Sequence, residues 1–238
     1  MSELPKRVLA IGAHPDDLEI QMGGTLAKYS ALDCQVIMAV ATDGSAGHMV
    51  IPANELAEIR HKEAQESADV IGADFYWLGF RDELIDDTID TRLRFVELIR
   101  QTRPDVIFTH DPNDYHPDHR TVSKLVFDAS FLSGLPNVKT NSDVHLGVQP
   151  LIYFDTSGGL NFQPSEYVDV TEVFKVKQTM FSKHVSQIQW LMDHDHIDIQ
   201  RIIQVSGEYR GNQCSVALAE GFRPELCSPR LRTYRLLP

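Results

Sequence analysis

The chain has 238 residues, of which 42% are hydrophobic and 24% are charged, and its formal net charge is -12. This composition argues against intrinsic disorder, and the length is ample for a buried core, so we predict a single domain over residues 1–238. The acidic balance disfavours nucleic acids and anionic membranes as partners, because like charges repel. We therefore expect a small-molecule substrate.

The cysteines and the apolar segments indicate the cellular compartment. Three cysteines occur without CxxC spacing or an even disulfide framework, which suits a reducing environment. Residues 1–7 are polar and contain no signal-peptide core, and no apolar run is long enough to span a bilayer. We therefore expect a cytoplasmic protein that does not act at a membrane.

The first two thirds of the chain alternate between apolar runs and amphipathic segments. Residues 7–13 (RVLAIGA) are β-branched and apolar and predict a buried strand, and Gly23-Gly24 then opens a predicted helix at 25–32. The alternation continues as strand 35–41, helix 54–71, strand 74–78, helix 91–102, strand 105–109, helix 119–132 and strand 151–155. This order is typical of right-handed βαβ units on a parallel sheet.

The last third of the chain has a different pattern. Residues 160–170 indicate a loop, residues 171–210 predict two helices with a break near 183–186, and residues 212–222 predict a final strand or hairpin. We therefore predict an α/β fold: a Rossmann-like three-layer α/β/α arrangement with a mostly parallel sheet. The C-terminal extension is expected to shape the pocket.

The first of two unusual motifs, Ala13-His14-Pro15-Asp16-Asp17, directly follows the first predicted strand. An imidazole and a carboxylate three residues apart can face one point in a turn or at the start of a helix, and both are zinc ligands. Two adjacent carboxylates allow one to hold a metal while the other carries protons. The spacing alone does not decide which of Asp16 and Asp17 has which role.

The second motif, His116-Pro117-Asp118-His119, lies in a polar loop after the fourth predicted strand. Its two histidines could share a metal or divide their roles, and Asp118 could fix the orientation of a histidine. Ligands bind beyond the carboxyl ends of the strands in open parallel sheets, where both motifs are expected. Together the motifs offer three metal ligands and leave a fourth position for water, as in catalytic zinc sites.

Extended to AHPDDLEIQMGGTLA and HDPNDYHPDHRTV, the two motifs resemble the LmbE/PIG-L-like family of metal-dependent deacetylases. The resemblance covers residues 7 to about 130. It implies that His14, Asp17 and His119 hold a zinc ion. It also implies a hydrolase that removes the acetyl group from an N-acetylglucosamine-type substrate, in a family whose members are often homo-oligomers. His and Asp ligation does not select zinc uniquely, so Fe²⁺ and Mn²⁺ also suit the site.

The resemblance assigns three further catalytic roles. Asp16 matches the general base, His116 the residue that stabilises the tetrahedral oxyanion, and Asp118 the carboxylate that pairs with His116. One position departs from the family pattern: some of its sugar deacetylases carry a mobile tyrosine two residues before the first histidine of HPDH. Asp114 holds that place and Tyr115 follows, so a tyrosine in the oxyanion hole is not expected here.

Two other residues are matched more loosely to positions that line the substrate site. Arg60 matches a family arginine near the substrate, and Asp82, in LGFRDE, matches an aspartate that lines the pocket. Each has a simpler interpretation. Arg60 and Glu63 could form an ion pair on the surface of a helix, and Asp82 could be an ordinary turn residue.

The main alternative is a lyase on the same site, because the family also contains metal-dependent hydratases of small unsaturated di- or tricarboxylic acids. Such a substrate needs several cationic anchors, for which Arg60, Arg81, Arg120 and Arg223 are candidates.

Phosphoester hydrolysis is less favoured because it usually requires more carboxylate ligands. Dinucleotide binding is disfavoured because the first strand is followed by His14-Pro15-Asp16 rather than GxGxxG. A binding module without catalysis is also disfavoured, because it gives no role to the carboxylate of Asp16 or Asp17 that does not hold the metal.

Overall fold

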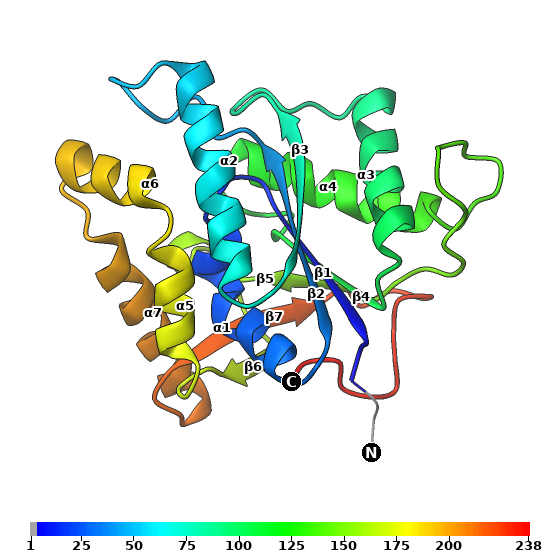
Figure 1. The fold of residues 1–238 in the computed structure, drawn as a ribbon. Coiled ribbons are helices and arrows are strands. Elements are labelled where there is room, and N and C mark those ends of the chain that lie inside the picture. Colours follow the sequence, from blue (N-terminus) through cyan, green and yellow to red (C-terminus); the bar gives the residue numbers. More distant parts are fainter. Residues whose placement is uncertain (1–3) are drawn as a thin grey trace.

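A seven-stranded sheet runs through the centre of the computed structural model, which describes residues 4–238 (Figure 1). Its order is β3-β2-β1-β4-β5-β7-β6. The strands are β1 (Arg7–Gly12), β2 (Gln35–Thr42), β3 (Asp74–Phe80), β4 (Val106–Thr109), β5 (Leu151–Phe154), β6 (Glu166–Asp169) and β7 (Ala219–Pro224). The first five are parallel, and β7 is antiparallel to both β5 and β6. The expected mostly parallel sheet is therefore confirmed.

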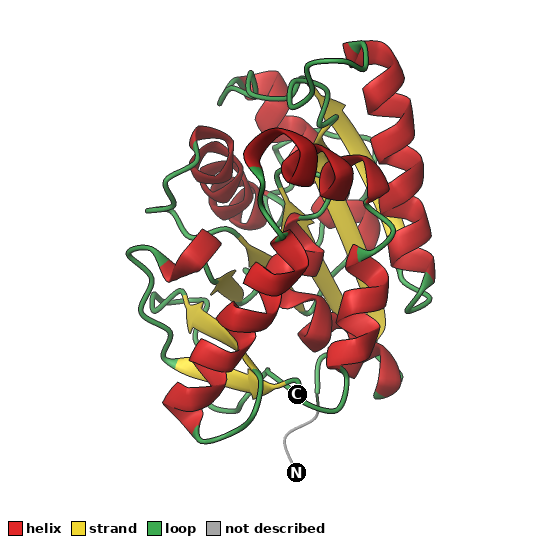
Figure 2. Cartoon of the chain, turned by 90° about the vertical axis from the view of Figure 1, so that its left-hand side faces the viewer, coloured by secondary structure: helices red, strands yellow, loops and turns green. Residues whose placement is uncertain are grey.

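Helices cover both faces of this sheet, which gives the predicted three layers (Figures 1 and 2). One face packs against α1 (Asp17–Ala31), α2 (Ala53–Asp69), α5 (Phe174–Phe181) and α7 (Ile199–Cys214). The other face packs against α3 (Ile89–Thr102) and α4 (Pro117–Leu132). A short helix, α6 (Val185–Trp190), continues into a π-helical turn at Leu191–Asp195 and lies near α2.

Alternation along the central strand explains the two cores. In β1, Val8 and Ala10 join the core under α1, whereas Leu9 and Ile11 join the core under α3 and α4. All four are fully buried. A strand with helices on both faces must be apolar on both, which is why residues 7–13 read as a continuous apolar run.

The structure corrects three details of the predicted elements. Helix α1 begins at Asp17 rather than at residue 25, so Gly23 and Gly24 lie inside it. A Cβ on Gly24 would lie 2.7 Å from the side chain of Val170, so this glycine permits close packing and does not mark the start of the helix.

The other two corrections concern the last third of the chain. The segment predicted as a loop contains β6, and the segment predicted as two helices contains α5, α6 and α7. The final strand, β7, is inserted between β5 and β6. The C-terminal extension is thus part of the sheet as well as a covering layer. The first three residues of the polar N-terminal segment lie outside the described part of the chain.

The sheet order places both histidine motifs at one point. Strands β1 and β4 are neighbours, and the chain leaves them toward opposite faces of the sheet, which is the topological switch point where ligands bind in open α/β sheets.

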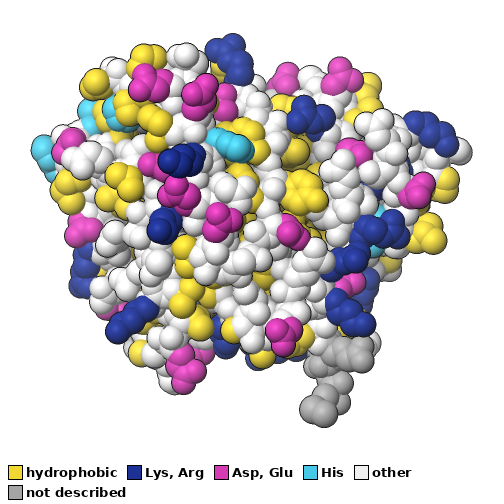
Figure 3. All heavy atoms as spheres, in the orientation of Figure 1, with side chains coloured by type: hydrophobic (Ala, Val, Ile, Leu, Met, Phe, Trp, Pro, Cys, Tyr) yellow, Lys and Arg dark blue, Asp and Glu magenta, His cyan; other side chains and the backbone are white. Residues whose placement is uncertain are grey.

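Among residues 4–238, no helix has the length and apolar character needed to cross a bilayer. Acidic and basic side chains are interspersed over the face seen in Figure 3.

Candidate metal centre

The loop after β1 carries His14, Asp16 and Asp17 into the switch point. Hydrogen bonds fix its start: the carbonyl of Ala13 accepts from both the backbone N–H and the hydroxyl of Thr42, each at 2.8 Å. Asp16 has a φ of 106°, a left-handed conformation that is strained for a residue other than glycine. This turn allows Asp17 to begin α1 while His14 and Asp17 still face each other, and the His14 N–H donates to Asp17 at 2.6 Å.

The second loop leads from β4 into α4, and His116-Pro117-Asp118-His119 forms the first turn of that helix. His116 is the N-cap, and its Nδ1 accepts from the N–H of Asp118 at 3.3 Å. Proline suits the first helical position because it has no N–H to leave unpaired. Residues three apart lie on one side of a helix, so His116 and His119 both face the switch point.

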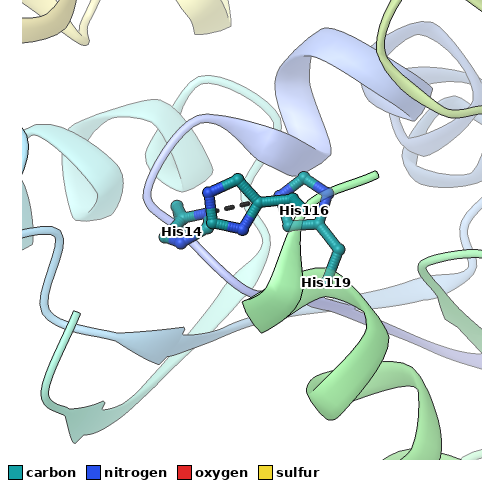
Figure 4. A group of neighbouring side chains, drawn as sticks. All are labelled: His14, His116 and His119. Atoms are coloured by element: carbon teal, nitrogen blue, oxygen red, sulfur yellow. Dashed lines mark hydrogen bonds between the residues drawn. The ribbon is translucent and has the colours of Figure 1, made fainter. Parts of the chain in front are cut away.

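Three predicted ligands come together there, and Figure 4 draws the two histidines among them, His14 and His119, with His116 beside them. Nδ1 of His14 lies 3.2 Å from Nε2 of His119. Oδ2 of Asp17 lies 3.4 Å from Nδ1 of His14, and Oδ1 of the same carboxylate lies 3.3 Å from Nε2 of His119. Two ligands bound at about 2.05 Å to a tetrahedral zinc ion are separated by about 3.3 Å, so these three groups fit such an ion. The chain therefore contains a His/Asp site that could hold a metal.

The pKa shifts at these groups indicate a site that attracts a cation. Burial lowers the pKa of His119, but the carboxylates of Asp17 and Asp114 outweigh it and raise that pKa to about 9. The pKa of His14 is likewise raised despite its burial, by Asp118, Asp17 and Asp82. Burial acts to raise the pKa of Asp17, yet His119 and His110 hold it well below its usual range. Metal binding would displace the protons of the two imidazoles.

Asp16 behaves differently from its neighbour. Burial, reinforced by the negative charge of Asp17, raises the pKa of Asp16 to about 7. Its side chain does not cap α1. Asp16 is therefore a buried carboxylate able to take up or release a proton near neutral pH, which is the property that a general acid/base requires.

Carboxylates on the outer side of the two histidines lie close to their remaining ring nitrogens. Nε2 of His14 lies 3.3 Å from Asp82 and 3.4 Å from Asp118, and Nδ1 of His119 lies 3.0 Å from Asp114. Metal-binding histidines typically have such a carboxylate on their second nitrogen, which fixes the ring and its tautomer. The structure thus places the carboxylate of Asp82 against His14.

The expected pairing between the carboxylate of Asp118 and His116 is wrong. That carboxylate accepts from the N–H of Glu83 at 2.9 Å and faces His14, so only the backbone N–H of Asp118 reaches His116. The carboxylate that faces Nε2 of His116 belongs to Glu83, at 3.2 Å. The difference follows from the geometry of the helix start, because the side chain of the N-cap residue His116 turns back to the backbone N–H of Asp118.

Comparison with known proteins now identifies the family. Residues 9–130 match the family described as "PIG-L: GlcNAc-PI de-N-acetylase". The chain belongs to the PIG-L family. The diacetylchitobiose deacetylase of Thermococcus kodakarensis is 34% identical over 188 residues, which cover 76% of this chain and 70% of that protein.

Two solved structures share the fold of this PIG-L protein. The N,N'-diacetylchitobiose deacetylase from Pyrococcus horikoshii has a TM-score of 0.82 and 30% identity over 93% of this chain and 84% of that one. The 4-carboxy-2-hydroxymuconate hydratase from Pseudomonas putida has a TM-score of 0.79 over 97% of this chain and 99% of that one. Its identity is only 19%, so this second likeness shows the fold alone.

Arg60 joins α2 to α6 and lies close enough to Asp16 to act on its pKa. Arg60 is only 5% exposed, and its guanidinium donates to Gln187 of α6. The alternative ion pair between Arg60 and Glu63 is wrong, because the carboxylate of Glu63 accepts from the N–H and hydroxyl of Ser186 at 2.8 and 2.6 Å. Arg60 instead lowers the pKa of Asp16 by its charge, against the larger effect of burial.

Sequence reasoning gave no role to His110, Asp114 and Glu83, which contact predicted site residues, or to His184, whose charge lowers the pKa of Asp16. His110 is 1% exposed and lies 3.2 Å from Asp17, but its Nε2 already accepts the N–H of Ala13 at 2.8 Å. His110 also lies close enough to share a metal with Asp17 and His119. The lone pair of its Nε2 is already used by the N–H of Ala13, however, so His14 is the better third ligand. The position of His110 directly after β4 was the signal available in the sequence.

A cavity of about 630 Å³ lies at the opposite edge of the sheet, beside Lys6, Asp105 and Gln149. Within residues 4–238, the clusters of His, Asp and Glu able to hold a metal ion all lie at the carboxyl edge instead. The candidate site is therefore the switch point between β1 and β4 and not the cavity at the opposite edge of the sheet.

Proposed function

We propose that this chain is a zinc-dependent hydrolase that removes the acetyl group from an N-acetylglucosamine-type substrate. The observation that carries the proposal is the spacing of His14, Asp17 and His119, with atoms 3.2 to 3.4 Å apart, beside a carboxylate whose pKa is about 7. The membership in the PIG-L family and the likeness to two diacetylchitobiose deacetylases support the substrate class.

His14, Asp17 and His119 would hold the zinc ion. When bound, zinc lowers the pKa of a coordinated water from 15.7 to about 7 and so supplies a nucleophile at neutral pH. Asp16 accepts the proton of the attacking water, which its raised pKa permits. The same carboxyl group then returns this proton to the leaving amine, as one group can serve as base and then as acid.

His116 is placed to stabilise the negative charge that develops on the carbonyl oxygen. Its Nδ1 accepts the N–H of Asp118, so the proton of the neutral ring lies on Nε2. That nitrogen is a hydrogen-bond donor beside the predicted ligands, since the rings of His116 and His14 are 4.6 Å apart, and the half-exposed carboxylate of Glu83 that faces it at 3.2 Å gives way to the substrate oxygen. A fixed donor at this position costs no reorganisation during the reaction.

The hydratase alternative has less support, because the cations that it requires are used or exposed. Arg223 pairs with Asp111, and Arg120 donates to the carbonyls of Asp114 and Tyr115. Arg60 is buried against Gln187, and Arg81 is exposed. None of the four arginines forms the uncommitted cluster that a di- or tricarboxylate substrate would need.

The proposal is tested with metal-reconstituted protein. The panel contains N,N'-diacetylchitobiose, N-acetylglucosamine and its inositol conjugate, with an unsaturated dicarboxylic acid as the competing substrate class. We expect release of acetate and a free amine from at least one sugar, and no loss of enoate ultraviolet absorbance. Hydration of the enoate without acetate release from any sugar would refute the deacetylase assignment.

A further inference from the structure

Helix α1, which carries the proposed ligand Asp17 at its first position, is interrupted at Met22. The backbone of Met22 has a φ of -145° and a ψ of 15°, outside the helical range. Met22 lies five residues after Asp17, which is about one and a half turns of helix. A short first segment of α1 thus runs from the proposed metal site to the interruption. The direction of this segment depends on what holds the interruption in place.

The carboxylate of Glu220, on β7, lies at this interruption. Its Oε1 accepts from the N–H of Gly24 at 2.9 Å, and its Oε2 accepts from the N–H and the hydroxyl of Thr25 at 2.7 and 2.6 Å. In an unbroken α-helix these two N–H groups would face the carbonyls four residues earlier. Glu220 therefore caps the second segment of α1 from another element, as an N-cap side chain does from within its own helix.

Lys177, on α5, completes this group of contacts. Its Nζ donates to Oε1 of Glu220 at 2.6 Å, and both side chains are 3% exposed. A buried ammonium and a buried carboxylate are costly to leave unpaired, so each holds the other in place. Both residues come from the last third of the chain, and the elements that carry them pack against α1 (Figure 1).

The two glycines of the sequence MGGT permit this close approach. A Cβ on Gly24 would lie 2.7 Å from the side chain of Val170 and 3.2 Å from Oε1 of Glu220. A Cβ on Gly23 would lie 3.2 Å from Cγ of Lys177. A larger residue at either position would push the last third of the chain away from α1. The glycines that follow the first motif thus serve the contact with Glu220 and Lys177.

We propose that Glu220 is a positioning residue for the metal site: it holds the interruption of α1 and so sets the direction in which the first segment presents Asp17 to the two histidine ligands. The inference rests on the proposed function, because it takes Asp17 as a metal ligand. Within the described chain, the hydrogen bonds of Glu220 run to α1 and α5 rather than to the proposed ligands. Its loss should therefore weaken zinc binding without the removal of any ligand.

The test compares Glu220→Gln with a double variant, Glu220→Gln with Lys177→Met. An amide presents an NH₂ group to N–H donors, so the cap is lost in both variants. Only the double variant also removes the ammonium that Glu220→Gln leaves buried without its carboxylate. We expect zinc affinity, measured by competition with a chelator, to fall by about tenfold or more in both, as when an outer partner of a metal ligand is lost.

Two further measurements report on α1 itself. In the zinc-free protein, amide hydrogen exchange in residues 17–25 should be faster in both variants than in wild type, because the N–H groups at the interruption lose their acceptor. In the Co²⁺-substituted protein, the visible absorption spectrum should change, because it reports the arrangement of the ligands around the metal. A role of Glu220 in overall stability alone would leave this spectrum as in wild type.

Glu97→Gln is the matched control. Glu97 accepts from the N–H and the hydroxyl of Ser142 at 3.0 and 2.7 Å, the same pattern that Glu220 makes with Thr25. It lies on α3, however, which covers the other face of the sheet. The zinc affinity of Glu97→Gln and its hydrogen exchange in residues 17–25 should match those of wild type.

The outcomes separate this inference from the proposed function. A zinc affinity equal to that of wild type in the double variant overturns the positioning role, and so does an equally large loss in Glu97→Gln. If Glu220→Gln alone does not fold, the double variant decides, because it leaves no buried charge unpaired. Absence of zinc binding to wild type contradicts the proposed function instead, while hydrogen exchange in the zinc-free protein still decides whether Glu220 holds the interruption of α1.

Discussion

Asp16 and Asp17 are neighbours in the chain and are each 7% exposed, yet their pKa values move in opposite directions. Burial and the charge of Asp17 raise the pKa of Asp16 to about 7, whereas His119 and His110 overcome burial to lower that of Asp17. Two carboxylates with divergent environments can divide two roles between them. This relationship supports the assignment of Asp17 to the metal and Asp16 to the proton, which the spacing of the motif left open.

The first prediction separates these two roles by substitution. Asp16→Asn should retain zinc and lower kcat by about 10²–10⁴, because an amide cannot carry the proton. Asp17→Asn should lose zinc instead, since a carboxylate ligand becomes a neutral amide. Zinc content after dialysis and kcat under zinc-saturated conditions check both. If Asp16→Asn is as active as wild type, the proton-transfer role is wrong.

The second prediction concerns His116. His116→Ala should lower kcat by about 10²–10³ with zinc content and KM nearly unchanged, because removal of one oxyanion donor has that effect. Tyr115→Phe is the matched control: Tyr115 is 58% exposed, so we expect its turnover to remain near that of wild type. A large loss in Tyr115→Phe with little loss in His116→Ala would move the oxyanion role to the tyrosine.

The third prediction concerns the carboxylates behind His14. Asp82→Asn and Asp118→Asn should each weaken zinc binding by about 10–100-fold, because they remove the negative charge that holds the second ring nitrogen. Competition with a coloured chelator measures the affinity. Asp86→Asn, exposed on the same loop, should leave the affinity unchanged. Equal affinities in all three variants would show that these contacts do not support the ligand.

The sequence predicted the parts of this protein that local pattern controls. Apolar runs such as residues 7–13 mark buried strands, and the strand order then places both motifs at one edge of the sheet. The closeness of His14, Asp17 and His119 could be predicted, because the two loops that carry them follow strands that are neighbours in the sheet.

What the sequence could not predict depends on contacts between distant segments. The local pattern marks Gly24 as the start of a helix, because Val170, against which it packs, is remote in the chain. The motif suggests a pairing of Asp118 with His116, its neighbour in the chain, whereas the carboxylate of Asp118 faces His14, which lies on the loop after another strand. His184 is contributed by the C-terminal third, and no local pattern connects it to Glu19.

His184, at the start of α6, and Glu19, on α1, form a buried pair. Nε2 of His184 lies 3.1 Å from Glu19, and the side chains are 1% and 3% exposed. The hydroxyl of Ser67 also donates to Glu19 at 2.5 Å. Burial lowers the pKa of His184, but Glu19 outweighs it and raises that pKa above 6.5. The pKa of Glu19 lies below 4.5 because His184 and Ser67 overcome the effect of burial.

The fourth prediction follows from the signs of these shifts. A raised histidine pKa contributes stability that is complete below 6.5 and is lost as pH rises through the folded-state pKa, and the lowered pKa of Glu19 contributes above 4.5. His184→Gln should therefore cost about 3–5 kcal/mol between those values, because it leaves a buried carboxylate without its cation. As the pH rises through the raised folded-state pKa of His184, the difference from wild type should shrink. Urea unfolding of the zinc-free protein at several pH values measures it, with His194→Gln, at an exposed pair with Asp195, as a control expected to have little effect. A cost that stays constant or grows with rising pH would mean that His184 is neutral in the folded protein and acts by packing alone.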